Sequence, residues 1–142
     1  MRGVSGPGSD APLIGGNTPI TVYTSDQVSA IGSDASLLDA VIRLASDEVG
    51  LLVVGTVEHV EGVVSERDVI RAIAGGRDPA ETPVSEVAAS RLVWCEPTAT
   101  VAEVATMMMA EYVRHVLVGE DDQLVGVVSA RDLLGAFASA PS

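Results

Sequence analysis

Two kinds of apolar spacing alternate along this chain. Helical spacing, in which apolar residues return after three or four positions, occurs at Leu37, Leu38, Val41, Ile42 and Leu44 and again at Val101, Val104, Met107 and Met108. Each stretch predicts a helix with one apolar face, which Asp34 or Thr98 is expected to cap. Two runs rich in β-branched residues follow each helix, at 51–54 and 60–64 and at 115–118 and 124–128. Their polar or glycine-led connections predict two β-hairpins.

Shorter elements surround these segments. Thr18-Pro19 and Thr82-Pro83 are each expected to open a short helical turn, with Thr as the N-cap and Pro in the first turn. Short strands are predicted at 28–31 and 91–95, before the two amphipathic helices. A last helix is predicted to start at Ser65 in the first half, where it ends near 75–76, and at Ser129 in the second. The order in each half is turn, strand, helix, strand, strand, helix.

The second half of the chain repeats the first without a gap. An offset of 64 residues places 18–75 on 82–139, and 14 of the paired positions are identical. The identities cluster, above all where GVVSERD at 62–68 matches GVVSARD at 126–132. We therefore expect two domains, at 18–77 and 82–140, after a flexible Gly/Pro/Ser-rich leader at 1–17.

Composition narrows the range of functions. Eight basic residues, all of them Arg, stand against 20 acidic ones, so the net charge is −12. Such a charge repels nucleic-acid backbones and anionic membranes, and the absence of Lys excludes Schiff-base and P-loop lysine chemistry. Aromatic residues are only 3% of the chain, so Val, Leu, Ile, Ala and Met must form the core. One cysteine and no long apolar run lead us to expect a cytoplasmic protein.

The repeated unit resembles a known family. A helical turn followed by β-α-β-β-α, twice, with the duplicated GVVS-x-RD junction and the segment VRHVLV at 113–118, is similar to the cystathionine-beta-synthase (CBS) domain. The resemblance covers residues 18–139. It implies an α+β fold in which tandem CBS domains pack with pseudo-twofold symmetry into a CBS pair, or Bateman module. It also implies two clefts that bind adenosine-containing ligands such as AMP, ADP, ATP or S-adenosylmethionine, flat homodimers, and a regulatory role.

Ser65 with Asp68, and Ser129 with Asp132, have two interpretations. Ser-x-x-Asp at a helix start is a capping-box pattern. In the resembled family the matching Asp binds the two hydroxyls of a ribose, a task that suits an acceptor-only carboxylate, and the matching Ser binds ribose or phosphate. Capping and binding are compatible for the serine.

Four basic residues complete the candidate ligand site. Arg67 and Arg131 adjoin the two aspartates and either form surface ion pairs or neutralise a phosphate. Arg114 and His115 start a predicted strand where the first half has Gly50 and Leu51, so the two clefts are expected to differ. The resemblance implies that these two residues reach nucleotide phosphates, while the alternative for His115 is a strand histidine bonded to backbone.

Other distinctive residues favour structural roles. Trp94 is expected in the core or at a dimer interface, with purine stacking as the alternative. Of Met107, Met108 and Met109, two are expected in the core and one against a partner subunit. Glu120, Asp121 and Asp122 lack EF-hand spacing, and His59 is expected in solvent, so we predict no metal site.

No catalytic motif occurs in the sequence, and Cys95 lies in a predicted buried strand where a thiol is usually inert. We therefore expect a stand-alone, non-enzymatic regulatory protein with no required cofactor. It is expected to bind an adenosine-containing ligand between its two CBS domains, to form a homodimer and to signal to an unidentified effector protein. The alternative is a ligand-free scaffold for dimerisation or docking.

Overall fold

The computed structural model describes residues 16–121 and 123–138, with backbone alone for 136–138. Repeat one (18–75) contains η1 (Ile20–Tyr23), β1 (Ala30–Ile31), α1 (Leu37–Asp47), β2 (Leu51–Gly55), β3 (Val60–Ser65) and α2 (Glu66–Ala74). Repeat two (82–139) contains η2 (Val84–Glu86), β4 (Trp94–Cys95), α3 (Val101–Glu111), β5 (His115–Glu120), β6 (Gln123–Ser129) and α4 (Ala130–Ala138). Most of the predicted leader lies outside the described residues.

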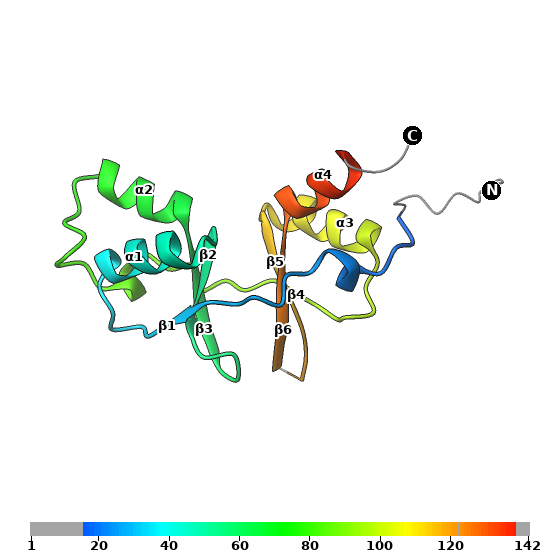
Figure 1. Ribbon diagram of the computed structural model, residues 1–142, viewed down its shortest axis with the longest axis horizontal. Coiled ribbons are helices and arrows are strands. Elements are labelled where there is room, and N and C mark those ends of the chain that lie inside the picture. The colour runs from blue at the N-terminus through cyan, green and yellow to red at the C-terminus, as the bar shows by residue number, and fades with distance from the viewer. Residues whose placement is uncertain (1–15, 122, 139–142) are drawn as a thin grey trace.

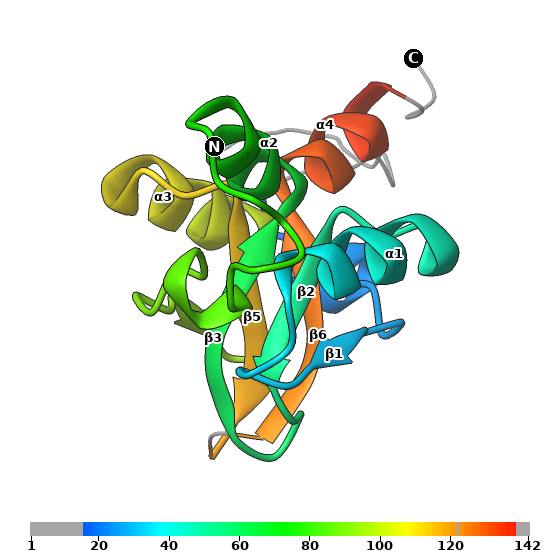
Figure 2. The same ribbon diagram turned by 90° about the vertical axis from the view of Figure 1, so that its left-hand side faces the viewer.

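The two repeats fold alike, and the predicted α+β class is confirmed. In each, a short strand pairs in parallel with the first strand of an antiparallel hairpin, which gives the sheets β1-β2-β3 and β4-β5-β6. The sheets face each other in the middle of the molecule, and the helices cover their outer sides (Figure 1). Seen from the side of repeat one, the hairpin β2–β3 lies over β5–β6 (Figure 2).

Alternation along the hairpin strands divides each sheet into two faces. Leu52, Val54 and Val64 are at most 1% exposed and pack against the helices of repeat one. Their neighbours Leu51 and Val53 point to the opposite side, towards the other sheet. Each sheet therefore supplies one face to its own core and the other to the space between the repeats.

The caps of α1 and α3 differ from the prediction. Ser36 and Thr100 cap these helices, two residues beyond the expected Asp34 and Thr98. The reason is a reciprocal capping box: the Ser36 hydroxyl accepts from the backbone N–H of Asp39, whose carboxylate accepts from the Ser36 N–H. A cap at Asp34 would place the apolar Leu37 at the reciprocating position, so it could not form this pair.

The Thr-Pro pairs also differ from the prediction, because Thr is not the N-cap of either turn. Pro19 and Pro83 occupy the N-cap positions in extended conformation, and the turns that follow are 3₁₀ helices. The Thr18 carbonyl instead accepts from the N–H of Val101, at the start of α3 in the other repeat. This hydrogen bond joins the two repeats.

Each 3₁₀ turn packs into the core of the other repeat. Ile20 of η1 is fully buried among the core residues of repeat two, and its N–H donates to the Ala99 carbonyl at 2.8 Å. Val84 of η2 is fully buried in the core of repeat one and donates to the Ala35 carbonyl at 2.7 Å. The two repeats are therefore interlocked, and neither core is complete without the other's turn.

This exchange explains the glycine of the duplicated GVVS motif. Ser25 and Val127 exchange backbone hydrogen bonds of 2.9 and 3.0 Å, which adds a segment of repeat one to the edge of β6. A Cβ on Gly126 would lie 2.4 Å from the Ser25 carbonyl oxygen. A Cβ on its counterpart Gly62 would likewise lie 2.8 Å from the carbonyl oxygen of Ala89 in repeat two. Any side chain at these positions would push the repeats apart.

Candidate functional site

A cleft of about 980 Å³ lies between the two sheets. Every lining residue from repeat two has its counterpart, 64 positions earlier, in the lining as well, so the cleft has the pseudo-twofold symmetry of the repeat. The two expected clefts are joined in this one space. All eight candidate site residues line it: Ser65, Arg67, Asp68, Arg114, His115, Ser129, Arg131 and Asp132.

The Ser-x-x-Asp motifs cap α2 and α4 at the edges of this cleft. Asp68 Oδ2 accepts from the Ser65 N–H and hydroxyl, both at 2.9 Å, and the Ser65 Oγ accepts from the Asp68 N–H at 3.2 Å. In repeat two, Asp132 Oδ2 accepts from the Ser129 N–H at 3.0 Å, and the Asp132 N–H donates to Ser129 Oγ at 2.9 Å. The capping interpretation is therefore confirmed in both repeats.

Capping engages only one oxygen of each carboxylate. Asp68 Oδ1 has the Arg71 guanidinium at 3.9 Å, a partly exposed ion pair that contributes little. Because Asp68 and Asp132 both line the cleft, the second carboxylate oxygen can accept hydrogen bonds from a molecule bound there. The geometry is compatible with both interpretations at once.

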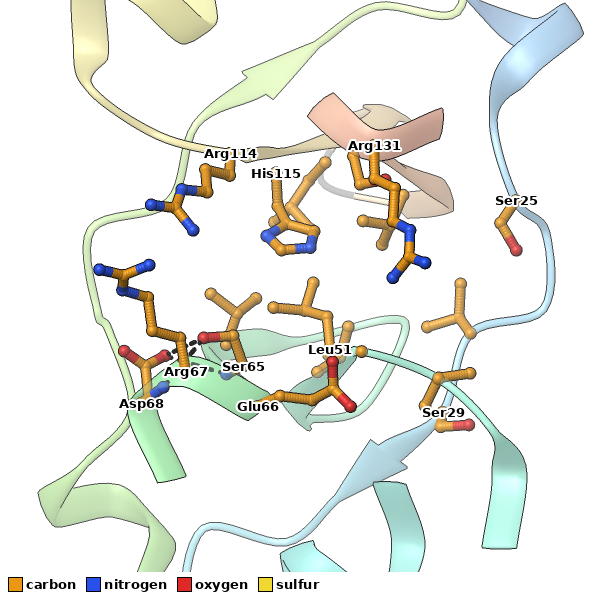
Figure 3. A pocket seen from close by; sticks show the side chains of 18 of the residues that line it. Ser25, Ser29, Leu51, Ser65, Glu66, Arg67, Asp68, Arg114, His115 and Arg131 are labelled. Carbon is orange, nitrogen blue, oxygen red and sulfur yellow. Dashed lines mark hydrogen bonds between the residues drawn. The ribbon is translucent and has the colours of Figure 1, made fainter. Parts of the chain in front are cut away.

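The arginines divide into two groups. Within the described residues, four of them form ion pairs with carboxylates: Arg43 with Asp47, Arg71 with Asp68, Arg77 with Glu86 and Arg91 with Glu111. The other three are Arg67, Arg114 and Arg131, for which the described part of the chain contains no carboxylate partner within 4.0 Å. All three line the cleft (Figure 3). Of the two alternatives left open for Arg67 and Arg131, the described residues show no surface ion pair for either.

His115 lies near the middle of the cleft, between the three arginines (Figure 3). It is half-buried, and its pKa is lowered from 6.5, mainly because burial disfavours the charged imidazolium. The carboxylates of Asp132 and Asp68 act in the opposite direction, and Arg114 acts with burial. At neutral pH the ring is neutral and can both donate and accept a hydrogen bond.

The structure adds lining residues that the sequence analysis missed. Ser25, Ser29, Glu48, Glu66 and Arg91 also face the cleft. The repeat offset pairs four of them with residues that also line the cleft: Ser25 with Ala89, Ser29 with Val93, Glu66 with Ala130 and Arg91 with Gln27. Glu66 follows the cap of α2, where an acidic residue is explained by the helix alone, so no local pattern distinguished it.

The remaining distinctive side chains lie outside the cleft lining. Trp94 packs against Gly119 of β5 and does not line the cleft. Met108 is buried in the core and Met107 packs against it, as expected for two core methionines, and Met109 is 77% exposed. Burial, together with Glu103, raises the pKa of the Cys95 thiol to about 11, so it stays protonated.

Metal ligands are not gathered in the described residues: no group of three or more His, Cys, Asp or Glu side chains is placed to hold an ion. Glu120 ends β5, Asp121 occupies the hairpin turn in left-handed conformation, and Asp122 lies outside the described residues. His59 is exposed in the other hairpin. In the same part of the chain, no helix has the length and apolar character needed to cross a membrane.

The duplicated fold, the capped helix starts and the shared cleft define a tandem pair of CBS domains. The CBS domain profile matches residues 20–75 and 84–139, and the chain belongs to this family. Among curated relatives, the CBS domain-containing protein YhcV of Bacillus subtilis is 29% identical over 108 residues, which cover 75% of this chain and 76% of YhcV.

Other relatives are longer or have been solved with a ligand. Arabinose 5-phosphate isomerase KdsD of Salmonella typhimurium is 25% identical over 116 residues, 81% of this chain, but the match spans only 35% of the isomerase. The solved structure of CBS domain protein PAE2072 from Pyrobaculum aerophilum, complexed with AMP, has a TM-score of 0.72 and 28% identity. The alignment covers 86% of this chain and 99% of that one.

Proposed function

We propose that the cleft binds an adenosine-containing ligand, namely AMP, ADP, ATP or S-adenosylmethionine, and that its occupancy regulates a partner protein. The observation that carries this proposal is the position of Arg67, Arg114 and Arg131. In a chain of net charge −12, these guanidinium groups lack carboxylate partners within the described residues, and all three line one cleft. The similarity to a CBS protein complexed with AMP supports the same ligand class.

Each part of such a ligand has a suitable partner. Guanidinium groups bind phosphate by paired N–H donors, and the free oxygens of Asp68 and Asp132 can accept from ribose hydroxyls. The apolar cleft surfaces of Leu51, Val53 and Leu117 can contact the base. A ligand that touches both repeats binds one relative arrangement of them better than another, so it shifts the population of shapes that a partner meets.

The regulatory role includes self-association and no chemical step. Helix residues with large exposed apolar side chains are Leu38, Ile42, Ile70, Ile73, Met109 and Leu134. Apolar side chains of this size on outer helix faces support a homodimer formed through these faces. The effector is a separate protein of unidentified class, and the proposed location is the cytoplasm.

A second candidate function is a ligand-free scaffold for dimerisation or docking. The two capping boxes favour it, because they give Asp68 and Asp132 a structural role without any ligand. Removing the carboxylate of Asp68 or Asp132 distinguishes the two functions. If the residue only caps its helix, stability alone falls, whereas if it also contacts a ligand, binding weakens as well.

Thermal denaturation with AMP, ADP, ATP and S-adenosylmethionine tests the proposal. A ligand at 100 times its dissociation constant should stabilise the protein by about 2.7 kcal/mol. Asp68→Ala should weaken binding about tenfold or more, through loss of a charge-assisted hydrogen bond. Asp39→Ala is the matched control, because Asp39 completes the same capping box on α1 but does not line the cleft. If no ligand stabilises the wild type, the scaffold function is correct.

A further inference from the structure

The two ends of the cleft carry different charges, although their backbones match. The position of Arg114 is occupied in repeat one by Gly50, and the position of Glu66 is occupied in repeat two by Ala130. Backbone geometry at the two pairs is the same: the Glu66 N–H donates to the Gly50 carbonyl at 3.0 Å, and the Ala130 N–H donates to the Arg114 carbonyl at 2.8 Å. These two differences between the repeats therefore change the charge without changing the backbone geometry.

Figure 3 shows how these side chains are distributed. Arg67 and Arg114 lie on the same side of the cleft as Asp68, whereas Arg131 lies on the other side with Ser25 and Ser29. Glu66 leaves the start of α2 and extends away from Asp68, towards the side of Arg131. We call these two sides the Asp68 end and the Arg131 end.

The charges at the two ends have opposite balance. At the Asp68 end two guanidinium groups, Arg67 and Arg114, outnumber one carboxylate. At the Arg131 end the repeat places Asp132 with Arg131, and Glu66 adds a second carboxylate. In a partly enclosed cleft these differences act on a bound phosphate with less screening than on an open surface.

Glu66 also occupies the space where an arginine would start. A Cβ placed on Gly50 would lie 3.2 Å from Glu66 Oε1, so the carboxylate covers this glycine. Glu48, two residues before Gly50, lines the cleft too, while its counterpart Tyr112 is 94% exposed and does not. Where repeat two has the cation Arg114, repeat one therefore presents the carboxylates of Glu66 and Glu48.

We propose that the cleft accepts one phosphate-bearing ligand per chain, at the Asp68 end, and that Glu66 is the specificity residue that excludes a second one from the Arg131 end. This inference rests on the proposed function, because it takes nucleotide binding as given. Glu66 acts by repelling the phosphate and by covering Gly50.

Isothermal titration of the full chain with AMP, and separately with ATP, tests the inference. The wild type should bind one nucleotide per chain. Glu66→Gln removes only the charge, and Gly50→Arg/Glu66→Ala gives repeat one the two residues that repeat two has. We expect a second site to become measurable in both variants, with at least about tenfold higher affinity than in the wild type. Glu58→Ala, an equal change of charge on an exposed hairpin residue outside the cleft, should still bind one nucleotide.

Two further variants assign the sites. Asp68→Ala should weaken the single wild-type site, whereas Asp132→Ala should weaken only the site gained in Gly50→Arg/Glu66→Ala. Two equal sites in the wild type, or one unchanged site in Glu66→Gln and the double variant alike, would overturn the inference and leave the proposed function standing. Absence of binding in every folded variant and the wild type would overturn the proposed function itself.

Discussion

His115 is a residue at which the two halves of the cleft differ in chemistry, since repeat one has Leu51 in its place. Burial lowers the pKa of His115 below 6.5, so the folded protein resists the proton that the unfolded chain accepts. In the pH range between the folded and unfolded pKa values the unfolded state binds more protons. Stability must therefore decrease as the pH falls below about 6.5.

We expect His115→Leu to remove this part of the pH dependence. The free energy of unfolding of the wild type should fall with pH below about 6.5 by at most about 1.4 kcal/mol per pH unit from this one group. Urea denaturation at several pH values between 5 and 7.5 measures it. His59→Leu, in an exposed hairpin position, serves as the control. Parallel curves for the wild type and His115→Leu would show that burial of this imidazole does not matter.

The capping boxes are the features that fix where the helices begin. Four residues, Ser36, Ser65, Thr100 and Ser129, accept from the N–H three positions on, with Asp or Glu at that position in every case. Two of these caps lie outside the cleft and two border it. Capping and ligand contact can thus be separated by comparing helices within one molecule.

Replacing a cap serine should weaken its helix by the ordinary amount. We expect Ser65→Ala to cost about 1 kcal/mol, and Ser36→Ala a similar amount, because each leaves a helix N–H without its acceptor. Ser46→Ala, on the exposed side of α1, should change stability by less than about 0.5 kcal/mol. Urea denaturation checks all three. A cost at Ser46 equal to that at Ser65 would contradict the capping argument.

Helices and strands with a clear apolar periodicity could be predicted from the sequence. Their first and last residues could not, because these depend on contacts with distant parts of the chain. The hairpin strands and the helices after Ser65 and Ser129 lie where expected. The strands predicted at 28–31 and 91–95 shrink to two residues each, and the residues before them line the cleft. The eight candidate residues converge as the repeat implied, but Glu66 was hidden by its helix-start position.

At the scale of the whole molecule, the exchanged turns join the two cores. Ile20 is the clearest test, since it is fully buried in the core of repeat two although it belongs to repeat one. We expect Ile20→Ala to cost about 3 kcal/mol through the cavity it leaves. Hydrogen exchange should accelerate first in α3 and β5. Val22→Ala, in the same turn but 61% exposed, should have little effect. Faster exchange confined to α1 and β2 would contradict the exchange of turns.

Reciprocal exchange of this kind has a consequence for the history of the fold. A polypeptide with a single repeat would hold an Ile20-like side chain that fits no site of its own and a gap that its own turn does not fill. Two such polypeptides could satisfy each other by trading turns, so the intertwined association of separate chains would precede their fusion. The link between the repeats would then have made permanent an intertwined contact that two separate chains already formed.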